Sequence, residues 1–340
     1  VGFFVVLIII VTLGYTVFVG YNDGANAIAT GIATRAMSHK TAVVITVIST
    51  VAAPILYTYF GAELSVANTI GKTVEHGALF DSNTYLAYSF VFAGVLGGLV
   101  WCLFSAKNRL PVSTSHSLLG GISGAGVAAF GFLPVDWNSL FIKIILTSVL
   151  VPLVSFLVSY IIMKIIRKIA YNVPVSSSGI IKRLQILNVA VLSSAISINN
   201  VQKPLGVLFL TFAATGFAYT NNTILLIVAL SALALTLGAC FGGTRIIHTV
   251  GRKIFKIQPI HSFLAQISVE FVIFAASGFG IPVSAGQAVS STVMGVGASD
   301  RFGQVNWSNS LRIFIFWVLT YPVTFVLGGA LTLIFKIFFH

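Results

Sequence analysis

The chain has 340 residues, of which 57% are hydrophobic and only 8% are charged, and its mean hydropathy is +1.01. Soluble proteins carry about 25% charged residues, so this composition excludes a soluble globular domain. The net charge of +12 is explained by Lys and Arg in cytoplasmic loops, and we expect no nucleic-acid partner.

Apolar runs of about 20 residues recur along the chain, and this is the length of a transmembrane helix. The runs are continuous rather than alternating, so a β-barrel is not expected. Cys102 and Cys240 lie in apolar segments and indicate neither a disulfide framework nor a metal site. We therefore expect an all-α polytopic protein of the cell membrane, in contact with the lipid bilayer.

The first predicted element, residues 1–34, is longer than one crossing needs and is interrupted by the polar stretch YNDGAN at 21–26. Asp23 lies in this stretch, with Asn22 before it and Asn26 behind it. A carboxylate in the membrane costs roughly 2.5–3.5 kcal/mol, so we expect Asp23 to bind a cation or a proton. Amide oxygens and unwound backbone carbonyls would complete such a site. The alternative is that these residues only cap an ordinary helix.

Four apolar segments follow in the first half, at about 41–60, 84–106, 112–131 and 139–166. The third opens with PVSTSH, a proline followed by Ser113, Thr114, Ser115 and His116. A helix that begins here offers free N–H groups, the positive end of its dipole and hydroxyl groups, which together suit an anion. The alternative is a capped helix with a Gly-rich packing face.

A basic stretch without acids, residues 167–183, leads into the second half. The next long element, residues 184–218, is interrupted by INNVQK, which contains Asn199, Asn200 and Lys203. We expect Lys203 to contribute to anion binding or to pair with an acid. A lysine that reaches the membrane surface is the alternative.

Glu270 is the only acid inside the apolar segments of the second half, and it precedes the motif PVSAGQ at 282–287. An acid within the membrane is a candidate functional residue, so we expect Glu270 to bind a coupling ion or a proton. A structural ion pair is the alternative. The motif itself begins a second predicted helix, with Ser284 in the place that Ser113 has in the first half.

Motifs recur in the same order in the two halves. PVSTSH is followed by PVSAGQ, VDWNS at 135–139 by VNWSN at 305–309, and YND at 21–23 by INN at 198–200. The spacing predicts a first repeat over 1–168, a cytoplasmic basic linker over 169–183 and a second repeat over 184–340.

Loop charge orients these repeats in the membrane. The loop with Glu63, Glu75 and Asp81 is predicted outside, whereas the matching basic loop at 243–261 is predicted inside. We therefore expect two inverted-topology repeats of about five crossings each, with broken helices at the polar motifs and both termini outside the cell. Inverted repeats with broken helices are typical of secondary transporters.

The paired motifs YNDGANAIATGI and PVSTSHSLLGG, with their degenerate second copies, resemble the inorganic phosphate transporter (PiT) family over nearly the whole chain. The resemblance implies a secondary transporter that brings phosphate inward with sodium or protons, and no enzymatic activity. In this sequence Asn200 stands where the family usually has a second aspartate. Ala285, Gly286 and Gln287 stand where it has Thr, Thr and His.

We accordingly expect a cation-coupled symporter that imports phosphate by alternating access. The expected phosphate-binding residues are Asn22, Ser113, Thr114, Ser115, Asn199, Lys203 and Ser284. The expected coupling-ion residues are Asp23, Asn26, Asn200 and Glu270, with sodium at Asp23 and Glu270 as the one bound ion and no other cofactor. A sulfate or other oxyanion permease of the same fold and an anion channel are alternatives. The Gly-rich segments are compatible with a homodimer.

Overall fold

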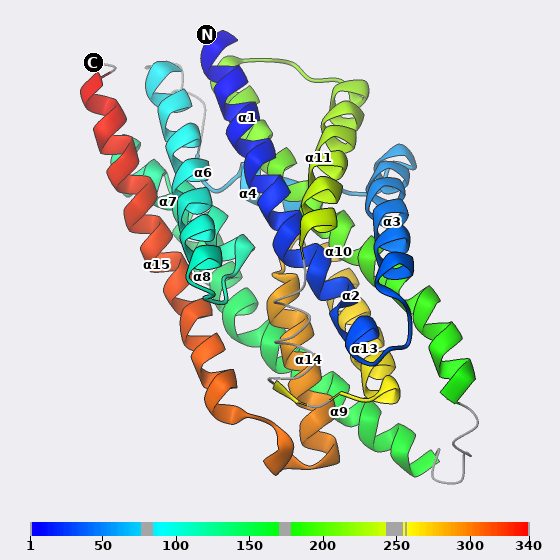
Figure 1. The fold of residues 1–340 in the computed structure, drawn as a ribbon. Coiled ribbons are helices and arrows are strands. Elements are labelled where there is room, and N and C mark those ends of the chain that lie inside the picture. The colour runs from blue at the N-terminus through cyan, green and yellow to red at the C-terminus, as the bar shows by residue number, and fades with distance from the viewer. Residues whose placement is uncertain (1, 76–83, 170–177, 243–253, 256, 339–340) are drawn as a thin grey trace.

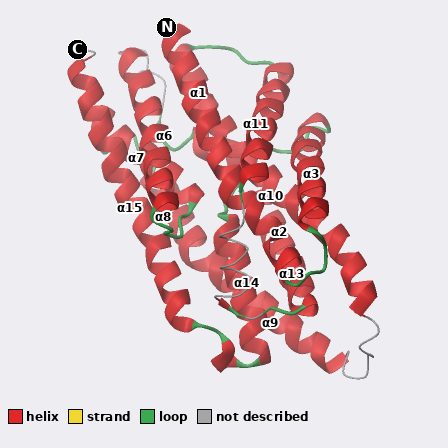
Figure 2. Cartoon of the chain, viewed as in Figure 1, coloured by secondary structure: helices red, strands yellow, loops and turns green. Residues whose placement is uncertain are grey.

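The computed structural model describes residues 2–75, 84–169, 178–242, 254–255 and 257–338. Within these ranges the chain is almost entirely helical, and the only β-type pairing is an isolated bridge between Val74 and Val135 (Figure 2). The all-α class predicted from composition is confirmed. Part of the predicted linker (170–177) and parts of the predicted loops (76–83, 243–253) lie outside the described residues.

The helices follow one another in two series (Figure 1). The first half contains α1 (Gly2–Val19), the π-helical turn η1 (Gly20–Gly24), α2 (Ala25–Ala33), α3 (His39–Tyr59), α4 (Ser65–Gly71), α6 (Thr84–Lys107), α7 (Thr114–Phe130), α8 (Trp137–Ile145), the π-helical turn η2 (Leu146–Leu150) and α9 (Val151–Ile169). The second half contains α10 (Ser178–Thr215), α11 (Asn221–Phe241), α13 (Pro259–Gly278), α14 (Ala285–Asp300), the short 3-10 turn η5 (Phe302–Gln304) and α15 (Trp307–Phe338).

Eight helices of the described chain are long and apolar enough to cross a membrane, which confirms a polytopic membrane protein. Four belong to each half, rather than the expected five. Besides the seven-residue α4, the helices outside these spans are α7 and α14, whose 17 and 16 residues are fewer than the roughly 20 that a crossing requires. They are short because each begins at buried residues inside the protein rather than at its surface.

The two halves are interleaved rather than separate. Helix α7 packs against α15 and α14 packs against α9, while α10 packs against α3 and α11 packs against α1. Figure 1 shows both termini at one end of the molecule, with the end of α9 and the start of α10 at the other. Both hydrophobic clusters of the core draw residues from both halves. The inverted relation of the repeats stays a prediction.

Close packing between the halves depends on glycine where helix backbones meet. A Cβ atom added at Gly124 of α7 would collide with the backbone oxygen of Phe325 in α15. One added at Gly328 of α15 would collide with the backbone oxygen of Gly121. Small residues allow this approach of two membrane helices. The Gly-rich face predicted for residues 112–131 is therefore a helix-packing surface, independently of any role of the start of α7 in anion binding.

The polar motifs interrupt their helices differently from the prediction. At Gly20–Gly24 the chain stays helical but makes a π-helical turn, which adds a residue to the turn and is frequent at functional sites. In the second half the predicted break is wrong, because α10 continues without interruption from Ser178 to Thr215. Pro204 lies inside α10 and lacks an N–H, so it leaves the carbonyl of Asn200 without its usual helical donor.

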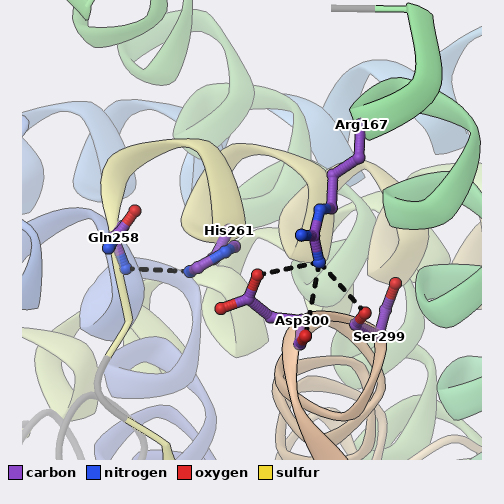
Figure 3. A network of polar contacts seen from close by, with 5 residues as sticks. All are labelled: Arg167, Gln258, His261, Ser299 and Asp300. Atoms are coloured by element: carbon purple, nitrogen blue, oxygen red, sulfur yellow. Dashed lines mark hydrogen bonds and ion pairs between the residues drawn. The ribbon is translucent and has the colours of Figure 1, made fainter. Parts of the chain in front are cut away.

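A polar network joins the last turns of α9 and α14 at the end of the molecule opposite the termini (Figure 3). The Arg167 guanidinium lies 3.0 Å from the Asp300 carboxylate and donates to the backbone oxygens of Ser299 and Asp300, each at 3.3 Å. Nearby, the backbone N–H of Gln258 donates to Nδ1 of His261 at the start of α13. A cation at a helix C-terminus interacts favourably with the helix dipole, so this contact holds the end of α14 against α9.

Candidate functional site

Asp23 is completely buried and joins three helical elements through its carboxylate. Oδ1 accepts a hydrogen bond from Asn22 at 2.9 Å. Oδ2 accepts from Nδ2 of Asn200 in α10 at 3.0 Å and from Oγ1 of Thr114 in α7 at 3.3 Å. Hydrogen bonds to an ionised group are stronger than those between neutral groups, and away from water they are needed to hold a charge. The structure therefore brings the two predicted polar motifs of the helices, YND and INN, into direct contact.

Lys203 lies on the opposite side of Asn200 from Asp23. Its side chain is completely buried. Nζ donates to Oδ1 of Asn200 at 2.5 Å and to the backbone oxygen of Val283 at 3.0 Å. The ammonium and the Asp23 carboxylate attract each other across the amide. A lysine that reaches the membrane surface, the alternative considered from the sequence, is excluded by this burial.

Asn199 holds the turn that leads into α14. Its Oδ1 accepts from the backbone N–H of Val283 at 3.1 Å. Its Nδ2 donates to Oγ of Ser277 at 2.8 Å and to the backbone oxygen of Ile281 at 3.2 Å. The three contacts span the end of α13 and the residues before α14, so Asn199 positions the start of α14 and has no free side-chain group for phosphate in this arrangement.

The starts of α7 and α14 meet beside this network. Ser113 is the N-cap of α7, with an extended backbone and a side-chain oxygen that accepts from the N–H of His116. Ser115, in the first turn, donates from Oγ to the backbone oxygen of Val283 at 2.9 Å. Ser284 is the N-cap of α14, and within the described part of the chain its buried Oγ has no hydrogen-bond partner. Two positive helix ends therefore approach one point.

The second helix start has lost side chains that the first one keeps. Gly286 faces Asn26, because a Cβ atom added to it would lie 3.3 Å from the Asn26 amide nitrogen. That nitrogen donates to the backbone oxygen of Asn22 at 3.0 Å. The following residue, Gln287, is completely buried, and neither side-chain amide atom has a hydrogen-bond partner among the described residues. Gln287 was not among the predicted binding residues, although it occupies the position of His116 in the repeated motif.

The His116 side chain contacts neighbouring helices rather than the residues around Asp23. Its Nε2 lies 2.7 Å from Oγ1 of Thr147 and 3.2 Å from Oγ of Ser148, both in η2. Its Nδ1 lies 3.4 Å from the backbone oxygen of Trp317 in α15. The first turn of α7 thus contacts both π-helical turns, η1 through Thr114 and η2 through His116. No motif in the sequence analysis predicted the π-helical turn η2.

Glu270 lies outside the hydrogen-bond network of Asp23. It is half-buried in α13, and no partner for its Oε1 is found in the described residues. Gln266, one turn earlier, donates to the backbone oxygen of Ala27 and to Thr30 in α2. Ser277, two turns later, contacts α10. Residues at this spacing share a helix face, so Glu270 lies on the face of α13 turned toward α2 and α10.

A small cavity with apolar and polar lining residues adjoins the site at Asn200. Its volume is about 10 Å³, and its lining includes Gly24, Thr46, Ser193 and Ser197. A cavity of this size admits about one water molecule. The hydroxyl groups and the Asn200 amide could form hydrogen bonds with a water molecule there, whereas phosphate is too large for the cavity.

Comparisons with known proteins agree over most of the chain. Residues 19–328 match the model of the phosphate transporter family (PHO4). A protein of Bacillus subtilis strain 168 is 31% identical over 326 residues, covering 95% of each chain. A protein of Mycobacterium tuberculosis H37Rv is 32% identical over 330 residues, covering 96% of this chain and 76% of the relative. Both carry the name "Probable low-affinity inorganic phosphate transporter".

A solved structure described as "The sodium-dependent phosphate transporter" has the same fold. Its TM-score is 0.81 at 22% sequence identity, and the match covers 98% of this chain and 99% of the other. The proteins named in these matches are transporters and not enzymes. With its motifs, its membrane helices and a family match over most of its length, this chain belongs to the phosphate transporter family.

Proposed function

We propose that the protein imports inorganic phosphate together with a cation, either sodium or a proton, across the cell membrane. The observation that carries the proposal is the meeting of the α7 and α14 N-termini, which Ser115 joins through its bond to Val283. Helix N-termini bind anions through their free N–H groups and their dipoles. Membership of the phosphate transporter family and the names of the relatives support phosphate as that anion.

The anion would bind to groups from both halves. Hydroxyl groups of the two helix starts and backbone N–H groups of their first turns would donate to the phosphate oxygens. The residues concerned are Ser113, Thr114, Ser115 and Ser284, with Asn22 at the adjoining motif, while Asn199 positions the start of α14. The Lys203 ammonium, which contacts the backbone just before Ser284, adds a positive charge beside them. Charge-assisted hydrogen bonds of this kind are strong and favour an oxyanion.

The coupling cation would bind to the intramembrane acids, Asp23 and Glu270. Both are buried or half-buried in helices that cross the membrane, where an acid is expensive unless a cation or proton neutralises it. Oxygen atoms of Asn26 and Asn200 and carbonyls of the η1 turn would complete the ligands of a sodium ion. No other cofactor is proposed.

Alternating access would expose this site to each side of the membrane in turn. The helix pairs α6–α7 and α13–α14 carry the two helix starts, and each packs partly on the other half of the chain. Movement of these pairs against the interleaved helices would open one side while the other stays closed. Transporters of this kind place substrate and coupling ions near the membrane midplane, between the halves.

Uptake of radiolabelled phosphate into proteoliposomes tests the proposal. We expect an inward sodium or proton gradient to drive accumulation, and excess sulfate to compete weakly. Equal competition by sulfate, arsenate or molybdate would identify a general oxyanion permease. Conductance without coupling in planar bilayers would identify a channel, and no uptake under any gradient would refute transport.

Ser115→Ala tests whether the helix starts bind the anion. A hydrogen bond to a charged group contributes about 1.5–3 kcal/mol, so we expect the KM for phosphate to rise at least about tenfold. Ser123→Ala is the matched control, because Ser123 lies in the same helix and bonds to Tyr321 and to its own helix. An unchanged KM in Ser115→Ala would move the anion site away from α7.

A further inference from the structure

The Lys203 ammonium lies in an unusual environment for a buried cation. Its hydrogen-bond acceptors are two neutral oxygens, Oδ1 of Asn200 at 2.5 Å and the backbone oxygen of Val283 at 3.0 Å. In the described part of the chain, the only ion pair within 4 Å is Arg167–Asp300, far from this site in the fold. Amide and carbonyl oxygens are, with carboxylates, the groups that coordinate small hard cations in proteins.

The charge of Asp23 faces Lys203 through one intervening amide. Both side chains are completely buried. A charge left alone in such a place costs several kcal/mol, and removing one partner of a buried pair leaves the other uncompensated. The negative carboxylate and the positive ammonium therefore neutralise each other across Asn200, and this part of the site has no net fixed charge.

The amide of Asn200 is suited to this bridge because its two ends differ. Nδ2 donates to Asp23 at 3.0 Å, while Oδ1 accepts from Lys203 at 2.5 Å. A carboxylate in the same place has no donor and would repel Asp23. Asn200 is the counterpart of Asp23 in the repeated motif. The substitution of an amide there and the presence of the lysine thus belong together.

We propose that the Lys203 ammonium is a tethered cation that takes the place of a mobile coupling ion at Asp23. Asp23 then needs no sodium ion to be neutral, and Glu270 is left as the acid that binds the mobile cation. This inference rests on the proposed cation coupling and refines it: the transporter carries one coupling cation fewer than it would with Asp23 free. The same ammonium, held by Val283 at the start of α14, keeps its charge beside the anion site in every cycle.

Equilibrium binding of radioactive sodium to the purified, full-length protein tests the inference without transport. Near neutral pH, where a lysine ammonium keeps its proton and carboxylates are ordinarily ionised, we expect Lys203→Gln to bind about one more sodium ion per chain than the wild type. Lys203→Arg, which keeps the charge, should bind the wild-type number. Lys143→Gln, which removes a lysine of α8 outside the site, is the matched control and should also be unchanged.

A second variant covers the case in which Lys203→Gln does not fold. Asn200→Asp keeps the lysine but places a carboxylate beside it, which removes the donor to Asp23 and competes for the ammonium. We expect the same gain of about one bound sodium ion, because Asp23 again lacks a counter-charge. The gain should disappear when Asp23→Asn is added to either variant. Wild-type sodium binding in both Lys203→Gln and Asn200→Asp would overturn the inference.

Transport provides a separate measurement. In proteoliposomes, the membrane potential at which net phosphate flux is zero gives the number of coupling cations per phosphate. We expect this number to rise by about one in Lys203→Gln, because Asp23 then takes up a mobile cation. If the wild type shows no gradient-driven uptake, the proposed function fails, whereas the sodium-binding comparison still decides the role of Lys203.

Discussion

At the scale of single residues, the two intramembrane acids have opposite surroundings. Asp23 accepts three hydrogen bonds and lies across an amide from Lys203. Glu270 has an oxygen for which the described residues supply no partner. Buried polar groups nearly always have hydrogen-bond partners, and one without a partner can be explained by an ion that binds there. We infer that Asp23 has a structural and electrostatic role and that Glu270 is the acid whose charge changes during transport.

This difference predicts two separable phenotypes. Asp23→Asn leaves Lys203 without its counter-charge, so we expect a loss of about 3–5 kcal/mol in the free energy of unfolding. Among the described residues Glu270 Oε1 has no partner to lose, so Glu270→Gln should unfold like the wild type, but its phosphate uptake should no longer respond to a cation gradient. Thermal unfolding in detergent and proteoliposome uptake measure the two effects.

Asp136→Asn is the control for loss of a carboxylate. Asp136 caps α8 by accepting from the N–H of Ser139 at 3.0 Å, and asparagine caps helices equally well. We expect this variant to keep both stability and coupling. Retention of full cation coupling in Glu270→Gln would contradict the role assigned to Glu270.

At the scale of elements, the site depends on where helices begin and on how closely they pack. α7 and α14 start inside the protein. The first turn of α7 reaches η1 through Thr114 and η2 through His116, and Lys203 of α10 donates to the backbone oxygen of Val283 just before α14. Such starts are held only if α7 and α15 can approach each other, which Gly124 allows by facing the backbone of Phe325. The Gly-rich face of α7 is thus a condition for the site rather than part of it.

A pair of Gly→Ala substitutions separates packing from helix propensity. Alanine favours a helix over glycine by up to about 1 kcal/mol, so Gly179→Ala, whose new Cβ would meet no atom within 4 Å, should be neutral or slightly stabilising. In Gly124→Ala the new Cβ collides with the Phe325 backbone, and we expect destabilisation by about 1–3 kcal/mol. Similar unfolding temperatures for the two variants would show that α7 and α15 do not need this contact.

At the scale of the whole molecule, the interleaving of the halves decides how the protein can move. Each short helix packs on a long helix of the other half, α7 on α15 and α14 on α9. At the end of the molecule where α14 finishes, Arg167 and Asp300 join α14 to α9. The Arg167 side chain is exposed and Asp300 is half-buried, and surface ion pairs contribute at most about 1 kcal/mol, so the contact can open without a large cost.

The orientation of the molecule in the membrane is a prediction at this scale. Loop charge predicts both termini outside the cell, and Figure 1 shows them at one end with the start of α10 at the other. In a variant without Cys240, we expect a cysteine at Phe3 to react with an impermeant maleimide from outside intact cells. A cysteine at Ile180 should react only after permeabilisation, and the opposite pattern would reverse the topology. The buried Cys102 serves as the unreactive control.

The sequence by itself determined the class of the protein and predicted the residues of the candidate site. Continuous apolar runs permit only helices that satisfy their own backbone groups in lipid, so the all-α polytopic fold follows from local composition. Polar motifs in such runs are costly, so they mark function, and Asp23, Asn200, Lys203 and Thr114 indeed lie together. The expected break in α10 failed because its polar side chains find partners while the helix continues.

Tertiary structure alone decided which of these groups bond to one another. Asn200 and Asp23 are 177 residues apart, and Ser115 and Val283 are 168 apart. Local propensity carries no information on such pairs, because they depend on how the helices of the two halves interleave. That packing produces the Asn200 bridge between Asp23 and Lys203 and the contact of His116 with η2. It also leaves Oε1 of Glu270 without a partner among the described residues.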